Sequence, residues 1–264
     1  MNEGMVVYWL IIIMTALGGF FTKSLKLSGA IGAIVIGVVI LEAFQWHGLV
    51  VVGSFFASSS IWSKYKYKDK QKLEQKLAKS AQRDWQQVVA NGGAAALFSI
   101  CFILLQNEVL FYAFLAAVSG ANSDTWASEI GTLSKKKPLS LIRFKEVEKG
   151  TSGAVSILGT IAGLAGSFFI VMVIWLLEPD LPTTSLLLVG VAGFFGNLLD
   201  TILGAYVQAE YTCNICELKT ELTSHCLKKT TLSKGVSWIN NEVVNFTSSV
   251  ISGLLIILSQ FLLL

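Results

Sequence analysis

The residues in this chain best suited to chemistry are acids inside or beside long apolar stretches. Asp124 ends Gly-Ala-Asn-Ser-Asp, Asp200 follows Gly-Asn-Leu-Leu, and Glu242 follows Trp-Ile-Asn-Asn. Ionisable groups in a membrane span are costly and by default mark a functional site. Clustered carboxylates repel one another unless they are protonated or bind a cation, and oxygen ligands suit Mg²⁺. We therefore predict that Asp124, Asp200 and Glu242 hold Mg²⁺, with Glu129 as a further ligand or a helix-end group.

Amide side chains accompany the acids at helical spacing. Asn122 lies seven residues before Glu129, and Asn197 lies three residues before Asp200, so each pair shares a helix face. We predict that Asn122 and Asn197 serve catalysis by orienting metal-bound water and phosphate. Further amides are predicted to bind substrate: Asn91, Asn241 and Asn245. For any single amide, a hydrogen bond between neighbouring helices is the alternative.

A short segment rich in glycine and hydroxyl groups precedes another apolar stretch. It consists of Lys149, Gly150, Thr151, Ser152 and Gly153. At a helix N-terminus, free backbone N–H groups, hydroxyls and a lysine can cradle a phosphate. The same residues also make an ordinary N-cap, and their spacing is not that of a P-loop. We predict that this segment binds phosphate, with Arg83 clamping the nucleotide.

Cysteines form a third group. Cys213-x-x-Cys216 is followed by His225-Cys226 in a loop predicted to face the reducing cytoplasm, where disulfides are not expected. The first pair has zinc spacing, while the adjacent His225 and Cys226 are an unusual second pair. A Zn²⁺ site or redox-sensitive knuckle and unligated packing cysteines both remain open.

The elements that position these groups must be membrane helices. Of 264 residues, 53% are hydrophobic and 14% are charged, against about 25% charged in ordinary soluble domains. Apolar stretches of about 20 residues match the thickness of a bilayer. The composition excludes a large soluble catalytic domain and a disulfide scaffold. We predict an all-α polytopic membrane protein, one integral membrane domain over 1–264, with eight spans: 5–21, 27–44, 49–62, 88–105, 109–128, 154–177, 185–206 and 243–264.

The basic residues predict the orientation. All 20 Lys and Arg residues fall on one side of these spans, which by the positive-inside rule is the cytoplasm. We predict external termini, a first helix that is retained rather than cleaved, a multi-pass chain in the cell membrane and a cytoplasmic active face. The cytoplasmic loops are 63–84, 132–150 and 207–236. Lysines at 64–79 suit contact with anionic membrane lipids, and positive charge spread along a membrane surface does not imply nucleic acid binding.

The motifs together resemble the integral membrane family called domain of unknown function ninety-two, to which a plant phytyl-phosphate kinase belongs. The resemblance covers nearly the whole chain in order, and Asp124-Thr-Trp-Ala-Ser-Glu129-Ile-Gly131 is its most specific segment. The other matching segments are 87–93, 150–153, 200–205, 213–216, 225–226 and 238–245. Lys149, Ala154 and Glu242 depart from the residues usual in the family. The resemblance implies Mg²⁺-dependent transfer of the γ-phosphate of CTP, or another nucleoside triphosphate, to an isoprenyl monophosphate.

Two other functions fit the same composition. A carrier or flippase for an anionic lipid or ion also has glycine-interrupted helices with buried polar groups. A membrane assembly protein without catalysis would pair its acids with arginines. The sequence sets neither the isoprenoid length nor the oligomeric state. Because the polar residues gather toward one end of the predicted helices, the sequence favours an enzyme acting at the membrane interface.

Overall fold

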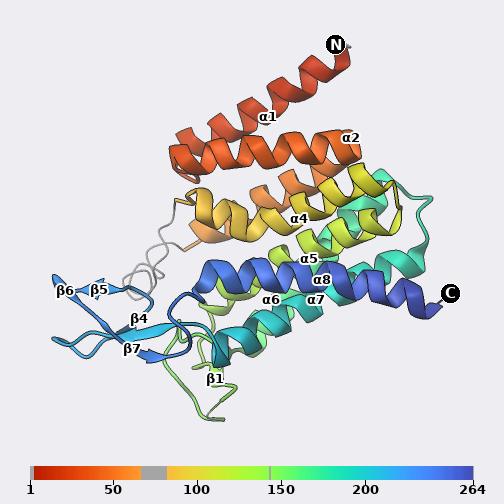
Figure 1. Ribbon diagram of the computed structural model, residues 1–264. Coiled ribbons are helices and arrows are strands. Elements are labelled where there is room, and N and C mark those ends of the chain that lie inside the picture. Colours follow the sequence, from red (N-terminus) through yellow and green to blue (C-terminus); the bar gives the residue numbers. More distant parts are fainter. Residues whose placement is uncertain (1–2, 67–81, 143, 264) are drawn as a thin grey trace.

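The computed structural model describes residues 3–66, 82–142 and 144–263, and within these the chain is a bundle of helices with small strands at one end (Figure 1). The helices are α1 (Glu3–Phe21), α2 (Leu27–Lys64), α4 (Trp85–Leu105), α5 (Val109–Gly131), α6 (Ile157–Leu177), α7 (Thr183–Tyr206) and α8 (Asn241–Leu263). Helix α1 lies at the edge of the bundle, against α2 (Figure 1). The predicted helical membrane architecture is confirmed.

Helix α2 doubles back on itself. Gln45 has φ 52° and ψ −145° in the middle of its 38 residues, which breaks the helical path. The Nζ of Lys64, at its last residue, donates to the carbonyl of Thr22 at 3.0 Å, just before its first turn. A straight helix of this length would hold its ends about 57 Å apart. The second and third predicted spans are therefore two arms of one continuous element.

The prediction of eight spans is wrong in number. Among the described residues there are seven helices, and five of them, α2, α4, α6, α7 and α8, are long and apolar enough to cross a membrane. Helix α1 offers only the shorter apolar run Met5–Phe21. Helix α5 carries Asn122, Asp124 and Glu129 in its second half, and these polar residues lower its hydropathy. Because α5 is surrounded by other helices, its surface does not have to be apolar. A count of apolar helices therefore does not include it.

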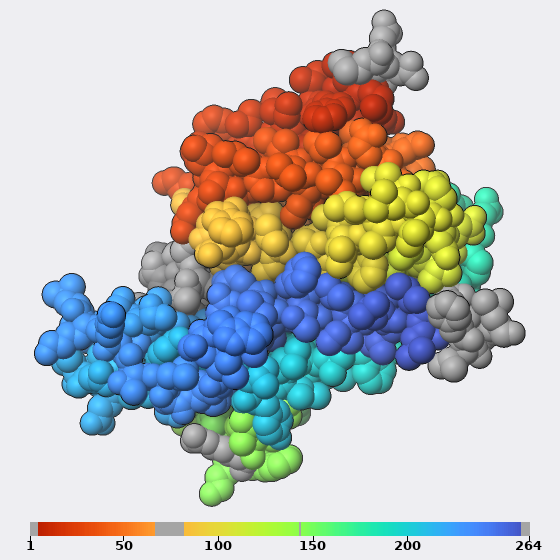
Figure 2. Space-filling model, viewed as in Figure 1, coloured from red at the N-terminus to blue at the C-terminus, as the bar shows by residue number. Residues whose placement is uncertain are grey.

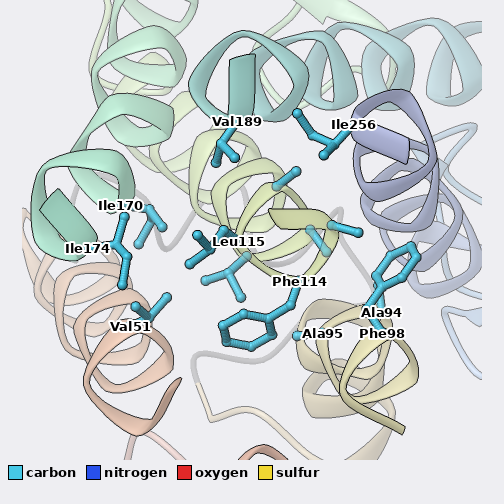
Figure 3. Packing of buried hydrophobic residues seen from close by; sticks show 14 of the residues in the cluster. Val51, Ala94, Ala95, Phe98, Phe114, Leu115, Ile170, Ile174, Val189 and Ile256 are labelled. Atoms are coloured by element: carbon cyan, nitrogen blue, oxygen red, sulfur yellow. The ribbon is translucent and has the colours of Figure 1, made fainter. Parts of the chain in front are cut away.

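The centre of the bundle is α5. Its residues Ala113 to Ser123 are buried without a break, because α6, α7, α8, α4 and α2 all pack around it. Figure 3 shows Phe114 and Leu115 of α5 in the middle of the cluster, with Val51, Ile170, Val189 and Ile256 approaching from four other helices. The first half of α5 is thus an apolar core that fixes the position of its polar second half.

Polar bonds join α5 to α6 just beyond this core. The Asn122 amide donates to the carbonyl of Gly166 at 2.7 Å, and the Ser123 hydroxyl donates to that of Gly163 at 2.8 Å. Glycine lacks a side chain, so the two backbones approach closely enough for these bonds. Such bonds between membrane helices are worth about 0.6–2 kcal/mol each.

The two ends of the bundle differ in chemistry. The N-termini of α2, α4, α6 and α8 and the C-termini of α5 and α7 lie at one end, together with all the basic residues of the described segments. At the other end, where α2 turns, His47 Nε2 lies 2.7 Å from Glu178 Oε1. Within 63–84, residues 67–81 lie outside the part of the chain that the structure describes, so the predicted lysine loop is untested.

Small antiparallel strands occupy the loops at the basic end. β1 (Leu139–Ser140) pairs with β2 (Ala154–Val155). β3 (Glu210–Thr212) lies between β4 (Lys219–Thr220) and β7 (Thr231–Lys234), and β5 (Ser224–His225) pairs with β6 (Lys228–Lys229). The segment from β3 to β7 projects beyond the helices (Figures 1 and 2). The helix predicted from Ala154 begins at Ile157 instead, because Ala154 and Val155 pair as a strand and Ser156 caps the helix.

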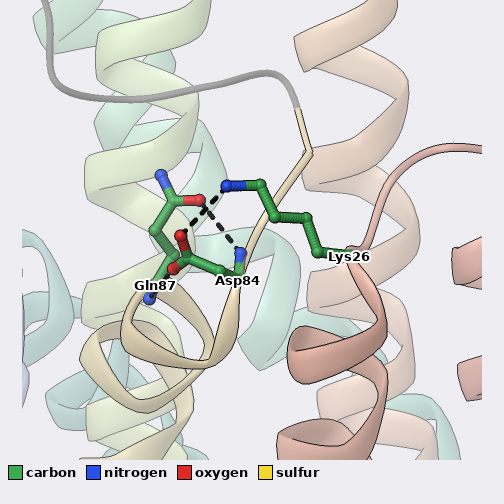
Figure 4. A network of polar contacts seen from close by, with 3 residues as sticks. All are labelled: Lys26, Asp84 and Gln87. Carbon is green, nitrogen blue, oxygen red and sulfur yellow. Dashed lines mark hydrogen bonds and ion pairs between the residues drawn. The ribbon is translucent and has the colours of Figure 1, made fainter.

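The entry to α4 is fixed by a local polar network. The Asp84 carboxylate accepts from the backbone N–H of Gln87 at 3.2 Å, and the Gln87 side-chain oxygen accepts from the N–H of Asp84. The Nζ of Lys26 lies 3.3 Å from the same carboxylate (Figure 4). This capping box satisfies N–H groups that a helix start leaves open. The carbonyl of Arg83 accepts from the N–H of Lys26 at 2.9 Å, so α2 and α4 hold Arg83 between them.

Gly29 allows this contact, and its replacement tests it. A methyl group at Gly29 would collide with the backbone carbonyl of Arg83, whereas one at Gly53 of the same helix meets nothing within 4 Å. We expect Gly29→Ala to destabilise the protein by about 1–3 kcal/mol, the usual cost of overpacking. Gly53→Ala should be neutral or stabilising by up to about 1 kcal/mol, because alanine favours helix. Thermal unfolding in detergent measures both, and equal midpoints for the two variants would contradict the packing described.

Candidate functional site

A cavity of about 330 Å³ opens at the basic end of the bundle. This volume lies within the range of small-ligand sites, about 300–1,000 Å³. Its walls come from six helices, α2 and α4 to α8, and from the loops that join α5 to α6 and α7 to α8. The predicted site residues on these walls are Arg83, Asn91, Asp124, Glu129, Lys149, Gly150, Thr151, Ser152, Gly153, Asn197, Asp200, Asn241, Glu242 and Asn245.

The acids reach the cavity from three different helices. Asp124 extends from α5, Asp200 from α7 and Glu242 from the first turn of α8, and each is half-buried. The three carboxylates therefore line one partly dehydrated space, where repulsion between such groups would favour a bound cation. Carboxylate and amide oxygens are the donor set that suits Mg²⁺.

Helix α8 positions Asp200. The hydroxyl of Ser248 donates to Asp200 Oδ2 at 3.0 Å. With its amide nitrogen facing Asp200, Asn245 donates to the same oxygen at 3.2 Å and to the carbonyl of Asn241 at 3.0 Å. Ser248 is absent from the sequence prediction, although its position three residues after Asn245 places both on one helix face.

Arg83 and Glu129 meet through a serine. Ser63 donates to Glu129 Oε1 at 2.8 Å, and the guanidinium of Arg83 donates to Ser63 at 3.4 Å and to Ser60 at 3.3 Å. Burial lowers the pKa of Arg83 from its usual value, and the negative charge of Glu129 works against that decrease. Arginine remains protonated at neutral pH. The cavity therefore carries a fixed positive charge on its α2–α4 wall.

The glycine segment is a turn rather than a helix N-terminus, which corrects the sequence prediction. Gly150 and Gly153 have φ values of 79° and 74°, in the left-handed region that favours glycine. A side chain on Gly153 would collide with the backbone of Ala205, and the Ser152 hydroxyl donates to the carbonyl of Gly204 at 2.8 Å. The turn thus packs against the C-terminal part of helix α7. Lys149 is anchored beside it, since its Nζ donates to the carbonyl of Thr132 at 3.0 Å.

Two cavity residues come from a loop segment that gave no signal in the sequence. Gln208 Nε2 donates to Glu221 Oε1 at 2.7 Å, and Ser152 donates to Gln208 Oε1 at 3.0 Å. Gln208 and Glu221 both line the cavity. They are thirteen residues apart, in the segment that contains β3 and β4. Neither helical nor strand periodicity in the sequence could therefore have predicted that they lie together.

Asn122 does not line the cavity, unlike the other predicted residues of α5. Its side chain is fully buried; its amide nitrogen donates to Gly166 and its oxygen accepts from Ser58 at 3.1 Å. Both functions of the amide are used in joining α5 to α6 and α2. The structure therefore favours the interhelical alternative for this one amide.

The cysteine group lies apart from the cavity walls. Cys213, Cys216, His225 and Cys226 place one ligand atom each within 4.8 Å of one another. Hydrogen bonds from the backbone at Cys216 and Ile215 lower the pKa of Cys213 to about 6. Interaction with the neighbouring thiol of Cys216, together with desolvation, raises the pKa of Cys226 to about 11. Cys101 lies elsewhere, on α4.

A bundle of helices with a polar cavity at one end, five of them long and apolar enough to cross a membrane, is the architecture of a multi-pass membrane protein. The sequence profile of integral membrane protein DUF92 matches residues 10–253, and the chain belongs to this family, as the motifs predicted. It is 32% identical to the uncharacterized membrane protein MJ0933 of Methanocaldococcus jannaschii, over 93% of this chain and 90% of that one.

Two relatives come from Arabidopsis thaliana. Protein PGR is 30% identical over 92% of this chain and 91% of its own length. Protein VTE6, chloroplastic, is 26% identical over 89% of this chain and 65% of its own length. No solved structure matches the chain. The family profile, over residues 10–253, includes the elements that build the cavity.

Replacing asparagines tests the assignment of Asn122 to structure. We expect Asn122→Ala to lower stability by about 1–3 kcal/mol, because it removes the buried hydrogen bonds of the amide to Gly166 and from Ser58. Asn91→Ala should cost less, since Asn91 is half-buried at the cavity and donates only to Gln87 of its own helix. Thermal unfolding in detergent compares the two variants. A larger loss of stability in Asn91→Ala than in Asn122→Ala would contradict the structural role of Asn122.

Proposed function

We propose that the protein is a membrane-embedded phosphotransferase that moves the γ-phosphate of CTP, or another nucleoside triphosphate, to an isoprenyl monophosphate of the phytyl type. The observation that carries the proposal is the meeting of Asp124, Asp200 and Glu242 with the glycine turn and two basic residues around one cavity. The resemblance to a family with a phytyl-phosphate kinase supplies the substrate class.

The reaction is a transfer between two polyanions. An oxygen of the lipid monophosphate forms a bond to the γ-phosphorus, the bond from that phosphorus to the β–γ bridging oxygen breaks, and the nucleoside diphosphate leaves. The attacking oxygen is already anionic, so a strong base is not required. Positioning and charge neutralisation supply most of the catalysis in such reactions.

The cavity residues divide into anionic and cationic groups that fit this chemistry. Asp124, Asp200 and Glu242 would hold Mg²⁺, which when bound neutralises phosphate charge and orients the nucleotide. Glu129, close to Arg83 through Ser63, is a further candidate ligand or a partner of that cation. Residues proposed to position water and phosphates are Asn91, Asn197, Asn241 and Asn245.

The glycine turn and the basic groups contact phosphate in this proposal. Thr151 and the backbone of Gly150 to Gly153 line the cavity, with Lys149 at its edge. Ser152 supports the turn through Gly204 and Gln208, so its hydroxyl fixes the shape of the cradle. Arg83 provides positive charge from the opposite wall.

The location of the cavity suits a lipid substrate. A prenyl chain anchors in the bilayer, so its phosphate lies at the membrane surface, where the ends of the helices meet water. The basic residues at the cavity end support a cytoplasmic active face, and we propose the cell membrane as the location.

A carrier for an anionic lipid or ion is the alternative with a specific observation in its favour. His47 and Glu178 form a second polar pair at the far end of the bundle, as a path through the protein would require. Between the two ends, however, α5 is buried and apolar from Ala113 to Val118. This closed layer favours an enzyme with access from one side.

Asp124→Asn tests the enzyme directly. Purified protein is incubated with Mg²⁺, CTP or ATP labelled at the γ-phosphate, and a panel of prenyl monophosphates. We expect labelled lipid diphosphate from the native chain, and a loss of turnover of about 10²-fold or more in Asp124→Asn, the scale of losing one electrostatic group at a transition state. Removal of Mg²⁺ with a chelator should abolish the reaction.

Asp180→Asn is the matched control, because Asp180 is exposed at the far end of the bundle. Asp180→Asn should leave the rate unchanged. Both variants should unfold at the same temperature as the native chain. Label transfer that survives Asp124→Asn would remove this residue from the mechanism. Absence of transfer with every nucleotide and lipid, together with uptake of the anion into proteoliposomes, would establish the carrier instead.

A further inference from the structure

The loop between α7 and α8 gathers three of the four cysteines and one of the two histidines of the chain. Cys213 follows β3 and Cys216 lies in the turn to β4, while His225 ends β5 and Cys226 lies in the turn to β6. The sulfur and nitrogen atoms of two hairpins therefore lie close to one another. This group takes no part in the proposed phosphotransfer.

We propose that this loop binds a structural Zn²⁺ ion through the Sγ atoms of Cys213, Cys216 and Cys226 and the Nδ1 atom of His225. The sulfurs of Cys216 and Cys226 lie 3.8 Å apart, and His225 Nδ1 lies 3.4 Å from the first and 3.2 Å from the second. Tetrahedral zinc with normal bond lengths places such atoms about 3.8 Å and 3.6 Å apart. The ligand atoms of Cys216, His225 and Cys226 therefore already have the spacing of a tetrahedral site, and the Sγ of Cys213 lies within 4.8 Å of each of them.

The backbone around the site also has the form of a metal-binding turn. The N–H of Ile215 donates to Cys213 Sγ at 3.4 Å, which stabilises negative charge on that sulfur. Cys226 has φ 52°, and the next residue, Leu227, has φ 61° and is fully exposed. Packing does not explain this turn, because the Leu227 side chain lies in water and both residues have strained backbone angles. Metal ligation would account for it, because the turn directs His225 and Cys226 to one point.

The metal joins two hairpins that are otherwise linked by side-chain hydrogen bonds, such as that from Asn214 to the carbonyl of Lys229 at 3.2 Å. β5 and β6 have two residues each and pair only with one another. Glu221, which lies between the two hairpins in sequence, contacts Gln208, and Gln208 contacts Ser152 of the glycine turn. The zinc site thereby fixes the segment that braces the cavity wall, without itself touching the cavity. This inference does not depend on the proposed activity.

The test is the metal content of the full-length chain, purified through a tag that binds no metal and measured by inductively coupled plasma mass spectrometry. We expect about one Zn²⁺ per chain, as in closed Cys₃His sites. Cys216→Ser and Cys226→Ser should lose the metal. Cys101→Ser, which changes the one cysteine outside the group, should retain it. Cobalt exchanged into the native chain should show thiolate charge-transfer bands and the visible absorption of tetrahedral coordination.

Zinc release from the native chain keeps the test independent of whether the variants fold. Titration with an organic mercurial should free the ion as the three loop thiols react, and hydrogen exchange should then increase at residues 150–153 but not at 106–108. Absence of zinc from the native chain, a disulfide among these cysteines, or equal zinc in Cys216→Ser and Cys101→Ser would overturn the site. Unchanged exchange at 150–153 would overturn its link to the glycine turn.

Discussion

The structure depends on how it accommodates negative charge inside an apolar bundle. Asp124, Asp200 and Glu242 come from three helices and line one cavity, although carboxylates in a partly dehydrated space repel each other and are costly to bury. In the proposed function a divalent cation would relieve both penalties at once. The same arrangement would then be a site for phosphates, because a bound cation and the nearby basic groups would attract them.

The bundle divides its helices into a packing half and a binding half. In α5 the residues from Ala113 to Val118 form the centre of the core, and the residues from Asp124 to Glu129, except Trp126, line the cavity. The hydrogen bonds of Asn122 and Ser123 to α6 lie between the two halves. They fix the rotation of α5, and this rotation determines which of its side chains reach the cavity.

Much of the site could be predicted from the sequence, because helices convert spacing into direction. Asn197 and Asp200 are three apart and both line the cavity, and the acids of α5, α7 and α8 were expected at the same end from the alternation of the spans. The glycine segment was found by composition, although its geometry as a turn braced by α7 was not. Arg83 was identified from its place at a helix start, and the capping box explains why it is held there.

Other features depend on contacts that a single sequence does not reveal. Asn122 has the same spacing and chemistry as its cavity-facing neighbours, and only the close approach of Gly166 makes it a structural residue. Gln208 and Glu221 reach the cavity through a loop fold without periodicity. The number of spans was overestimated: residues 27–64 form one element that turns at Gln45, between the two spans predicted there, and the polar second half of α5 lowers its hydropathy.

The central claim is that acids from separate helices jointly bind one divalent cation, and Mn²⁺ titration followed by electron paramagnetic resonance measures this without reference to any reaction. The account predicts one Mn²⁺ site per chain that Mg²⁺ displaces, with affinity weakened about tenfold or more in each of Asp200→Asn and Glu242→Gln and unchanged in Asp180→Asn. A chain that binds no Mn²⁺, or binds it equally well in all three variants, would contradict the account.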